Sequence, residues 1–349
     1  MTVQSFAPFS WTPLSLADAY TPRPPTRWVV DGLFRASSLS MLFGPPGCLK
    51  SLLALDLAAC VVAGVDWLPP DPGGTGGETY DVTQGASVLL DFDNGSDTTL
   101  ERLEAVGRTR NLPQAAPLYA VSMPQPWLDA SKIGHAQQLI GWLQGFQNLA
   151  LVIVDNLAAV SGSADENSSE MVQVLGAFRF VAEQTGAAIL LIHHARKASA
   201  SSKGQNGDSI RGHSSIMAAL DLALSVERDD DMVTLEAVKA RGNPPDPIGA
   251  RYTYTHKSGS YDLAEVRFFA AKPAKANRNQ DARAAVIDAL TKGGSMNQSA
   301  IVTTIQKANP KISRYRVRNA LEYLVKRGIV CERSGPLKNA LIYELGLTP

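Results

Sequence analysis

The sequence predicts an α/β fold with a mainly parallel central sheet, followed by a small basic C-terminal unit. Two observations lead to this prediction: short apolar runs alternate with amphipathic helical segments, and the charge divides near residue 275. The apolar runs cover residues 39–43, 86–92, 149–155 and 187–194. Near-continuous apolar strands separated by helices are typical of a parallel sheet that is covered on both faces.

Length and composition set the limits within which this fold is expected. The chain has 349 residues, of which 45% are hydrophobic, enough for one large domain and one small one. No apolar run of about 18 residues and no basic-then-apolar leader occurs, so we expect a cytoplasmic protein that makes no membrane contact. Its three cysteines, Cys48, Cys60 and Cys331, lack the spacing of a zinc site or a disulfide framework.

The net charge of zero hides a strong asymmetry. From Lys275 onward the chain carries 13 basic and 5 acidic residues, a net charge of +8, whereas residues 1–274 carry 20 and 28, a net charge of −8. An acidic body with a basic tail indicates that the tail meets a polyanion.

Changes in pattern suggest four segments. Residues 1–26 are rich in Pro, Ser and Thr and read as an irregular arm, residues 27–269 as the α/β domain, and residues 270–280 as a linker. Residues 281–349 show three helical patterns and then two short strands around a turn, the plan of a winged helix-turn-helix domain. The third helix carries candidate DNA-binding residues, with protein contact as the alternative use: Arg314, Arg316 and Arg318.

A phosphate-binding loop is predicted after the first apolar strand. Its candidate residues are Gly44, Pro45, Pro46, Gly47, Cys48, Leu49, Lys50 and Ser51. Backbone N–H groups of such a loop, together with the dipole of the helix that follows, cradle phosphates, and Lys50 would neutralise the β- and γ-phosphate oxygens. The Ser51 hydroxyl would hold Mg²⁺, so ATP and Mg²⁺ are the expected cofactors.

Leu49 departs from the motif GxxxxGK[S/T], which has glycine at this position. A γ-branched residue tolerates a positive φ poorly. A non-glycine residue could sit at this position if its backbone is near-helical and its side chain points away from the phosphates.

Further segments, taken in order, resemble one family. "VVDGLFRASSLSMLFGPPGCLKS", "VLLDFDNGSDTTLERLEAVG", "LVIVDNLAAVSG", "ILLIHHARKA", "DSIRGHSSIMAALDLALSV" and "VKARGNPPDPIG" are similar to RecA-like ATPases of the RepA type, relatives of the DnaB class of ring helicases. The resemblance covers about residues 27–268 and implies a RecA-like P-loop core.

The resemblance also implies roles at the strand ends. Asp155 would hold the water shell of Mg²⁺, and Asp93, with Asp91 as the competitor, would orient or deprotonate the attacking water. The family usually has glutamate here, and either aspartate is one methylene shorter. His194, favoured over His193, would sense the γ-phosphate.

Other basic residues resemble groups that act between subunits. Arg211, Lys239 and Arg241 resemble arginine fingers that reach a neighbour's nucleotide, although each taken singly could form a surface salt bridge. Fingers that act in trans imply a homo-oligomer, a ring of six. Arg196, Lys197 and Lys203 fit a channel loop that touches single-stranded DNA, with a plain solvated loop as the alternative.

The function that follows is an ATP-dependent, ring-forming DNA motor, a replicative helicase or helicase-like ATPase of a phage, plasmid or mobile element. The alternative is an ATP-switched DNA-binding regulator or recombination mediator that does not unwind DNA. A small-molecule kinase is disfavoured because the winged helix would have no role and no lid-like arginine cluster is evident.

Overall fold

A nine-stranded sheet forms the centre of the molecule in the part of the chain that the computed structural model describes. The described residues are 13–74, 76–162, 164, 170–194, 214–273, 278–326, 328–335 and 341–346. The strand order is β11-β10-β9-β8-β3-β7-β6-β4-β5. The strands are β3 (Leu39–Gly44), β4 (Ala86–Asp91), β5 (Leu118–Ser122), β6 (Leu149–Asp155), β7 (Ala188–His194), β8 (Leu222–Asp229), β9 (Met232–Ala240), β10 (Ile248–His256) and β11 (Leu263–Ala271).

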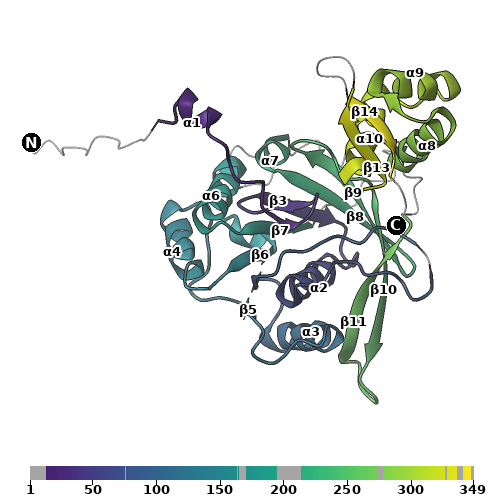
Figure 1. Ribbon diagram of the computed structural model, residues 1–349. Coiled ribbons are helices and arrows are strands. Elements are labelled where there is room, and N and C mark those ends of the chain that lie inside the picture. Colours follow the sequence, from purple (N-terminus) through teal and green to yellow (C-terminus); the bar gives the residue numbers. More distant parts are fainter. Residues whose placement is uncertain are drawn as a thin grey trace, which may run out of the picture.

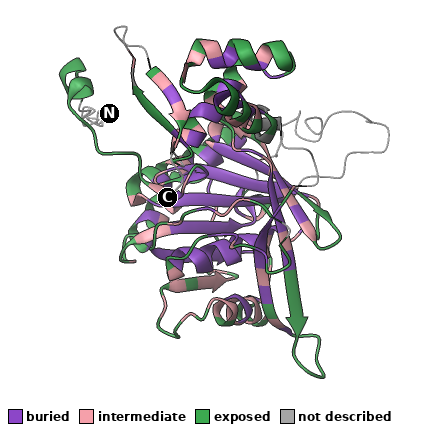
Figure 2. Ribbon diagram, turned by 45° about the vertical axis from the view of Figure 1, so that its right-hand side comes forward, coloured by how far each residue is buried: buried purple, intermediate pink, exposed green. Residues whose placement is uncertain are grey.

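The sheet is parallel from β8 to β5 and antiparallel from β8 to β11. The four predicted apolar runs are the central strands β3, β7, β6 and β4, which are almost entirely buried. Figure 2 shows these strands buried along their length, whereas the far end of β10 is exposed. The predicted α/β class with a mainly parallel central sheet is confirmed.

Helices cover both faces of the sheet (Figure 1). One hydrophobic core cluster lies under α2 (Lys50–Ala63) and α3 (Ser96–Thr109), and a second under α4 (Ile133–Leu143), α5 (Leu157–Val160), α6 (Glu170–Thr185) and α7 (Ser214–Ala219). Two covered faces explain why the strands carry apolar residues without alternation.

A buried ion pair fastens α2 to α3. Asp56 of α2 has no exposed surface, and Arg110, at the end of α3, donates to both its carboxylate oxygens at 2.6 and 2.8 Å. The Arg110 side chain is only 4% exposed. Because neither charged group reaches solvent, loss of either one would leave the other as a buried, unpaired charge.

The N-terminal part contains more regular structure than its composition suggested. Within the predicted irregular arm, α1 (Leu16–Tyr20) is a short helix capped by Ser15, and residues 1–12 lie outside the described residues. A hairpin of β1 (Trp28–Val30) and β2 (Phe34–Arg35) precedes β3. The expectation of an irregular arm was therefore wrong for α1, whose capping box satisfies its first N–H groups.

The C-terminal unit, residues 278–346, has its own small core. It consists of α8 (Arg278–Gly293), β12 (Met296–Asn297), α9 (Gln298–Ala308), α10 (Arg314–Lys326), β13 (Val330–Ser334) and β14 (Leu341–Leu345). The three helices and the hairpin lie where they were predicted, and β12 adds a third strand. Since β11 runs to Ala271 and α8 begins at Arg278, regular structure occupies both ends of the predicted linker.

Candidate nucleotide site

Four strands end at the same edge of the sheet, and the predicted P-loop, Asp93, Asp155 and His194 gather there. Register places Gly44 beside His194 on neighbouring strands β3 and β7, and Asp91 beside Asp155 on β4 and β6. The carboxyl edge of an open parallel sheet is where such folds bind ligands. Tertiary structure thus unites motifs that are far apart in the chain.

The loop after β3 has the backbone that phosphate binding needs. Gly44 touches the next strand so closely that a Cβ atom there would lie 2.4 Å from the carbonyl oxygen of Val226, and Gly47 has a φ of +79°. α2 begins directly after the loop, at Lys50, so its first N–H groups face this edge.

Leu49 adopts the conformation that the motif reserves for glycine. Its φ is 65° and its ψ is 20°, in the left-handed region, so Leu49 is accommodated without the near-helical backbone that was named above as a condition. A non-glycine residue in this region costs about 1–2 kcal/mol. The side chain is half-buried and packs against the core cluster under α2, which offsets the strain.

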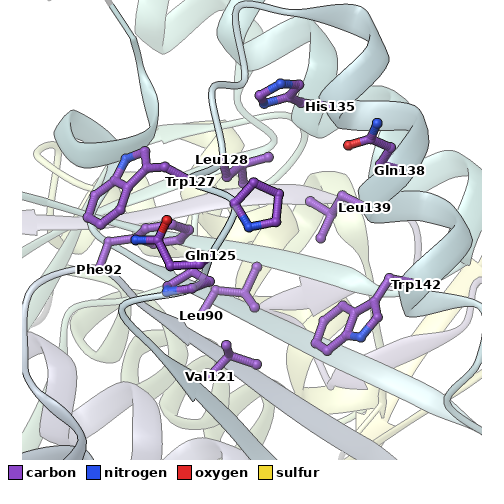
Figure 3. A pocket seen from close by; sticks show the side chains of 12 residues that line it. Leu90, Phe92, Val121, Gln125, Trp127, Leu128, His135, Gln138, Leu139 and Trp142 are labelled. Carbon is purple, nitrogen blue, oxygen red and sulfur yellow. The ribbon is translucent and has the colours of Figure 1, made fainter.

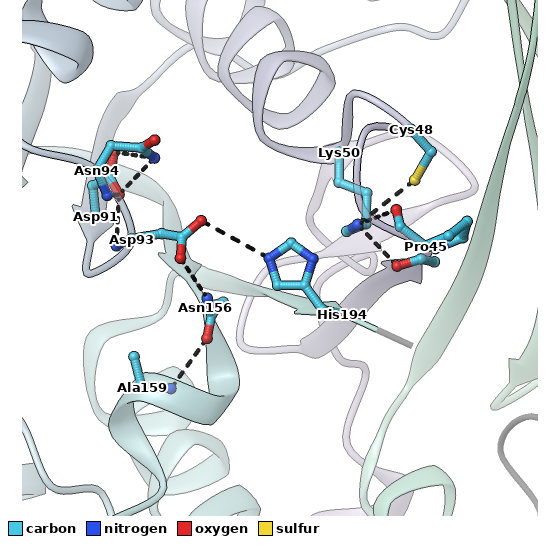
Figure 4. A network of polar contacts seen from close by, with 10 residues as sticks. Pro45, Cys48, Lys50, Asp91, Asp93, Asn94, Asn156, Ala159 and His194 are labelled. Carbon is cyan, nitrogen blue, oxygen red and sulfur yellow. Dashed lines mark hydrogen bonds and ion pairs between the residues drawn. The ribbon is translucent and has the colours of Figure 1, made fainter. Parts of the chain in front are cut away.

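Lys50 is buried and folded onto its own loop. Its Nζ donates to the carbonyl oxygens of Gly44 and Pro45 at 2.9 and 3.0 Å and lies 3.6 Å from Sγ of Cys48, as Figure 4 shows. The ammonium group is therefore held at the mouth of the loop. Burial raises the pKa of the Cys48 thiol, so this cysteine is a packing residue here rather than a thiolate.

Asp155 and Ser51 form the oxygen-rich side of the site. Burial raises the pKa of the Asp155 carboxyl to about 6, and the neighbouring Ser51 hydroxyl acts in the opposite direction. Oδ1 of Asp155 is buried and has no hydrogen-bond partner among the described residues. A hydroxyl and a carboxylate with an unused oxygen are donors that Mg²⁺ prefers, so these two residues fit the expected metal.

The two candidate acids after β4 have different surroundings. Asp91 is buried and accepts hydrogen bonds from the backbone of Asp93 and Asn94, from the Asn94 amide and from the Thr99 hydroxyl. These donors occupy both its oxygens, so Asp91 holds the turn together. Asp93 is exposed and faces the site.

Asp93, Asp155 and His194 converge from three different strand ends. Each offers a ligand atom, and these atoms lie within 4.8 Å of one another. Asn156 orients Asp93 by donating from Nδ2 to Oδ1 at 3.2 Å (Figure 4). Burial and the nearby Lys50 lower the pKa of His194, so its imidazole is neutral at neutral pH. His193, by contrast, is buried in the strand.

Lys239 and Arg241 lie at the opposite edge of the sheet. Lys239 pairs with Ala223 at the start of β8, and the backbone N–H of Arg241 donates to Asp221 at 2.7 Å. The Arg241 guanidinium donates to the carbonyl oxygen of Ala218 at 2.9 Å and lies 3.8 Å from Asp221. Neither residue approaches the P-loop of its own chain.

The candidate residues Arg196, Lys197, Lys203 and Arg211 lie outside the described residues. On α10, Arg314 and Arg318 are exposed, and Arg318 pairs with Glu322 at 3.2 Å. Arg316 differs, because it is half-buried and its Nη1 donates to the carbonyl oxygen of Lys311. It is therefore the least accessible of the three predicted DNA contacts.

Sequence reasoning missed two residues beside the site. Asn156 caps α5 through Oδ1 while its amide holds Asp93, and its position directly after Asp155 was the only available signal. Arg228, at the end of β8, donates to the carbonyl oxygen of Gly47 at 3.3 Å and lies over the ring of Tyr252. No local pattern marks Arg228, since its loop partner is distant in sequence.

An apolar pocket of about 390 Å³ adjoins the site (Figure 3). Phe92, next to Asp93, contacts Trp127 edge-on at 5.1 Å, and Trp127 is anchored to the carbonyl oxygen of Ala159. Leu139 and Trp142 of α4 close another side. This lining suits apolar side chains rather than a triphosphate.

Comparison with known proteins gives two findings. Residues 6–200 match the family model described as an AAA domain. A solved structure titled "The Structure Of A DnaB-Like Replicative Helicase And Its Interactions With Primase" is similar at a TM-score of 0.49 and 11% identity, covering 72% of this chain. The chain spans 66% of the length of that structure, just under two thirds.

Proposed function

This chain belongs to the AAA domain family, and from that premise we propose that it is an ATP-dependent, ring-forming DNA motor with helicase activity. The observation that supports the proposal best is the convergence of Lys50, Asp155 and Asp93 at one sheet edge. In such an ATPase Lys50 would bind the phosphates, Asp155 would hold the metal ion, and Asp93 would orient the attacking water.

Each residue of this edge has a distinct part in the proposed hydrolysis. Lys50 exchanges the carbonyl oxygens of its loop for the oxygens of the β- and γ-phosphates. Asp93, oriented by Asn156, accepts a proton from the attacking water, and neutral His194 contacts the γ-phosphate. Ser51 and Asp155 would hold Mg²⁺, which supplies charge neutralisation on the phosphates.

The position of the candidate fingers supports a ring. Lys239 and Arg241 lie at the sheet edge opposite the P-loop, which supports a role at a neighbour's nucleotide rather than at that of their own chain. A head-to-tail interface of this kind forms a ring when the rotation between subunits closes. We propose six subunits, with single-stranded DNA in the channel and duplex DNA at the C-terminal unit, which acts as a winged helix.

The source and setting belong to the same proposal. We propose a replicative role in a phage, plasmid or mobile element, in the cytoplasm. Among the described residues, no helix is long and apolar enough to cross a bilayer.

ATP hydrolysis with and without single-stranded DNA tests the assignment. Wild type should show turnover that DNA stimulates, and Lys50→Ala should abolish it. Lys132→Ala is the control, because the exposed Lys132 side chain pairs with Asp129 and not with a residue of the site. Turnover that survives in Lys50→Ala would refute the site.

A second candidate is an ATP-switched regulator or recombination mediator that does not unwind DNA. The short reach of Asp93 favours it, since weaker positioning of water slows hydrolysis. Strand displacement on forked DNA with ATP separates the two. Displacement that requires Lys50 supports the motor, and DNA-dependent turnover without displacement supports the switch.

A further inference from the structure

The C-terminal unit is seated on the loop that bears Arg241. This finger loop, residues 241–247, joins β9 to β10. Asn243 of the loop accepts a hydrogen bond from the hydroxyl of Tyr315 at 3.0 Å and donates to Glu322 at 3.4 Å. Both partners belong to α10, the helix predicted to contact DNA.

A second contact fixes the other end of the finger loop. Arg283 of α8 lies between Asp246 of the loop, at 2.5 Å, and Glu78 of the segment before β4. Its guanidinium also stacks 3.3 Å above the ring of Tyr323, whose hydroxyl donates to Glu78. The Asp246 side chain is 2% exposed, so this pairing is largely shielded from solvent.

The finger loop is stiff between these two contacts. Pro244 and Pro245 lie between Asn243 and Asp246, and proline restricts the backbone. Arg241, two residues before Asn243, is directed at Ala218 and Asp221 of its own chain. The contacts at Asn243 and Asp246 restrict how far the loop, and Arg241 at its start, can move.

DNA would compete for the same helix. Glu322 binds Asn243 through one oxygen and Arg318 through the other, so a phosphate that captures Arg318 acts on a residue that is linked to the loop. Net charge also favours binding of DNA by the C-terminal unit. Most of the net charge of +8 from Lys275 onward lies in this unit, whereas residues 1–274 carry −8. A polyanion therefore replaces the acidic body as the partner of the basic unit.

We propose that the C-terminal unit is a DNA-released clamp: docked, it holds Arg241 toward its own chain, and duplex DNA bound to α10 frees the finger loop. This inference rests on the proposed function, because it assigns Arg241 to a neighbour's nucleotide. It adds a regulation of that same site by DNA.

Spin labels test the movement without reference to ATP. Cys331, in β13, is exposed, whereas Cys48 and Cys60 are buried, so Cys331 and an introduced Ser258→Cys on the exposed β10–β11 turn can be labelled as a pair. Adding duplex DNA should lengthen and broaden the distance between the labels. An unchanged distance with DNA bound, or no binding of DNA, would overturn the clamp.

Variants test the release. Arg283→Ala should broaden the label distance without DNA and raise DNA-free ATP turnover about 5-fold or more, within the usual range of allosteric coupling. Tyr315→Phe removes one hydroxyl and should act in the same direction if Arg283→Ala proves unstable. Arg333→Ala, in an exposed pair with Glu344 inside the unit, should change neither quantity.

The two proposals fail in different ways. Wild type that hydrolyses no ATP refutes the motor, while the label distance still decides whether DNA releases the unit. Broadened distances in Arg283→Ala with unchanged turnover overturn the link between the clamp and the finger.

Discussion

Nε2 of His194 lies 3.9 Å from Oδ2 of Asp93, although the strands that end near these residues, β7 and β4, are separated by β6. The two side chains meet above the end of β6, where Asp155 lies. This relationship places Asp93, and not Asp91, beside His194 and Asp155, and it leads to the first prediction.

Asp93→Asn should reduce kcat by about 10²–10⁴-fold, the usual contribution of a general base, with little change in nucleotide affinity. Asp91→Asn should instead lower the free energy of unfolding by about 1–3 kcal/mol, because it weakens the charged acceptor of the turn. Steady-state ATPase assays, nucleotide titration and urea unfolding measure these effects. A stable, inactive Asp91→Asn beside an active Asp93→Asn would reverse the assignment.

Leu49→Gly should preserve nucleotide binding. Glycine relieves left-handed strain of about 1–2 kcal/mol but loses the packing of the isobutyl group, so stability should change little. Leu49→Val keeps an apolar side chain but is β-branched, which suits a positive φ far less. Binding of a fluorescent ATP analogue should weaken in Leu49→Val alone, and loss of binding in Leu49→Gly would show that the leucine itself is required.

Arg110→Met should lower the free energy of unfolding by about 3–5 kcal/mol, since it leaves Asp56 as a buried, unpaired charge. Adding Asp56→Leu in the same chain should recover much of the loss. Denaturant unfolding measures both, and Lys292→Ala serves as control because its pair with Asp288 is exposed and contributes about 0–1 kcal/mol. Equal effects of Arg110→Met and the control would contradict a structural role for the pair.

Arg241→Ala and Lys50→Ala should each be inactive alone but partly active when the two proteins are mixed. In a ring with fingers in trans, some interfaces then combine an intact P-loop with an intact finger from the neighbour. ATP turnover after mixing is the measurement. Asp93→Asn is a second change on the P-loop side of the interface. Mixed with Lys50→Ala it should give no recovery of turnover, whereas mixed with Arg241→Ala it should. No recovery in the mixture with Arg241→Ala would argue against action in trans.

The central fold could be predicted because its signals are local. Near-continuous apolar runs predicted β3, β4, β6 and β7. The glycine and proline residues of the loop after β3, followed by Lys50 and Ser51, predicted a phosphate site. Asp155 could be placed for the same reason, since it directly follows an apolar strand. Strand formation and loop conformation depend chiefly on neighbouring residues.

Other features depended on partners that are distant in sequence. Only the folded chain shows that Asp91 is occupied by Thr99 and its own turn, or that Leu49 is left-handed with its side chain on the core. The pairing of Asp56 with Arg110 likewise had no local signal.

Residue type and spacing alone specify the α/β class, the phosphate loop and the separation of an acidic body from a basic tail. Tertiary structure decided which acid faces the site, at which edge of the sheet Arg241 lies, and that α10 rests on the finger loop. Those outcomes depend on strand order and on contacts such as Tyr315 with Asn243, which form only when distant segments are packed together.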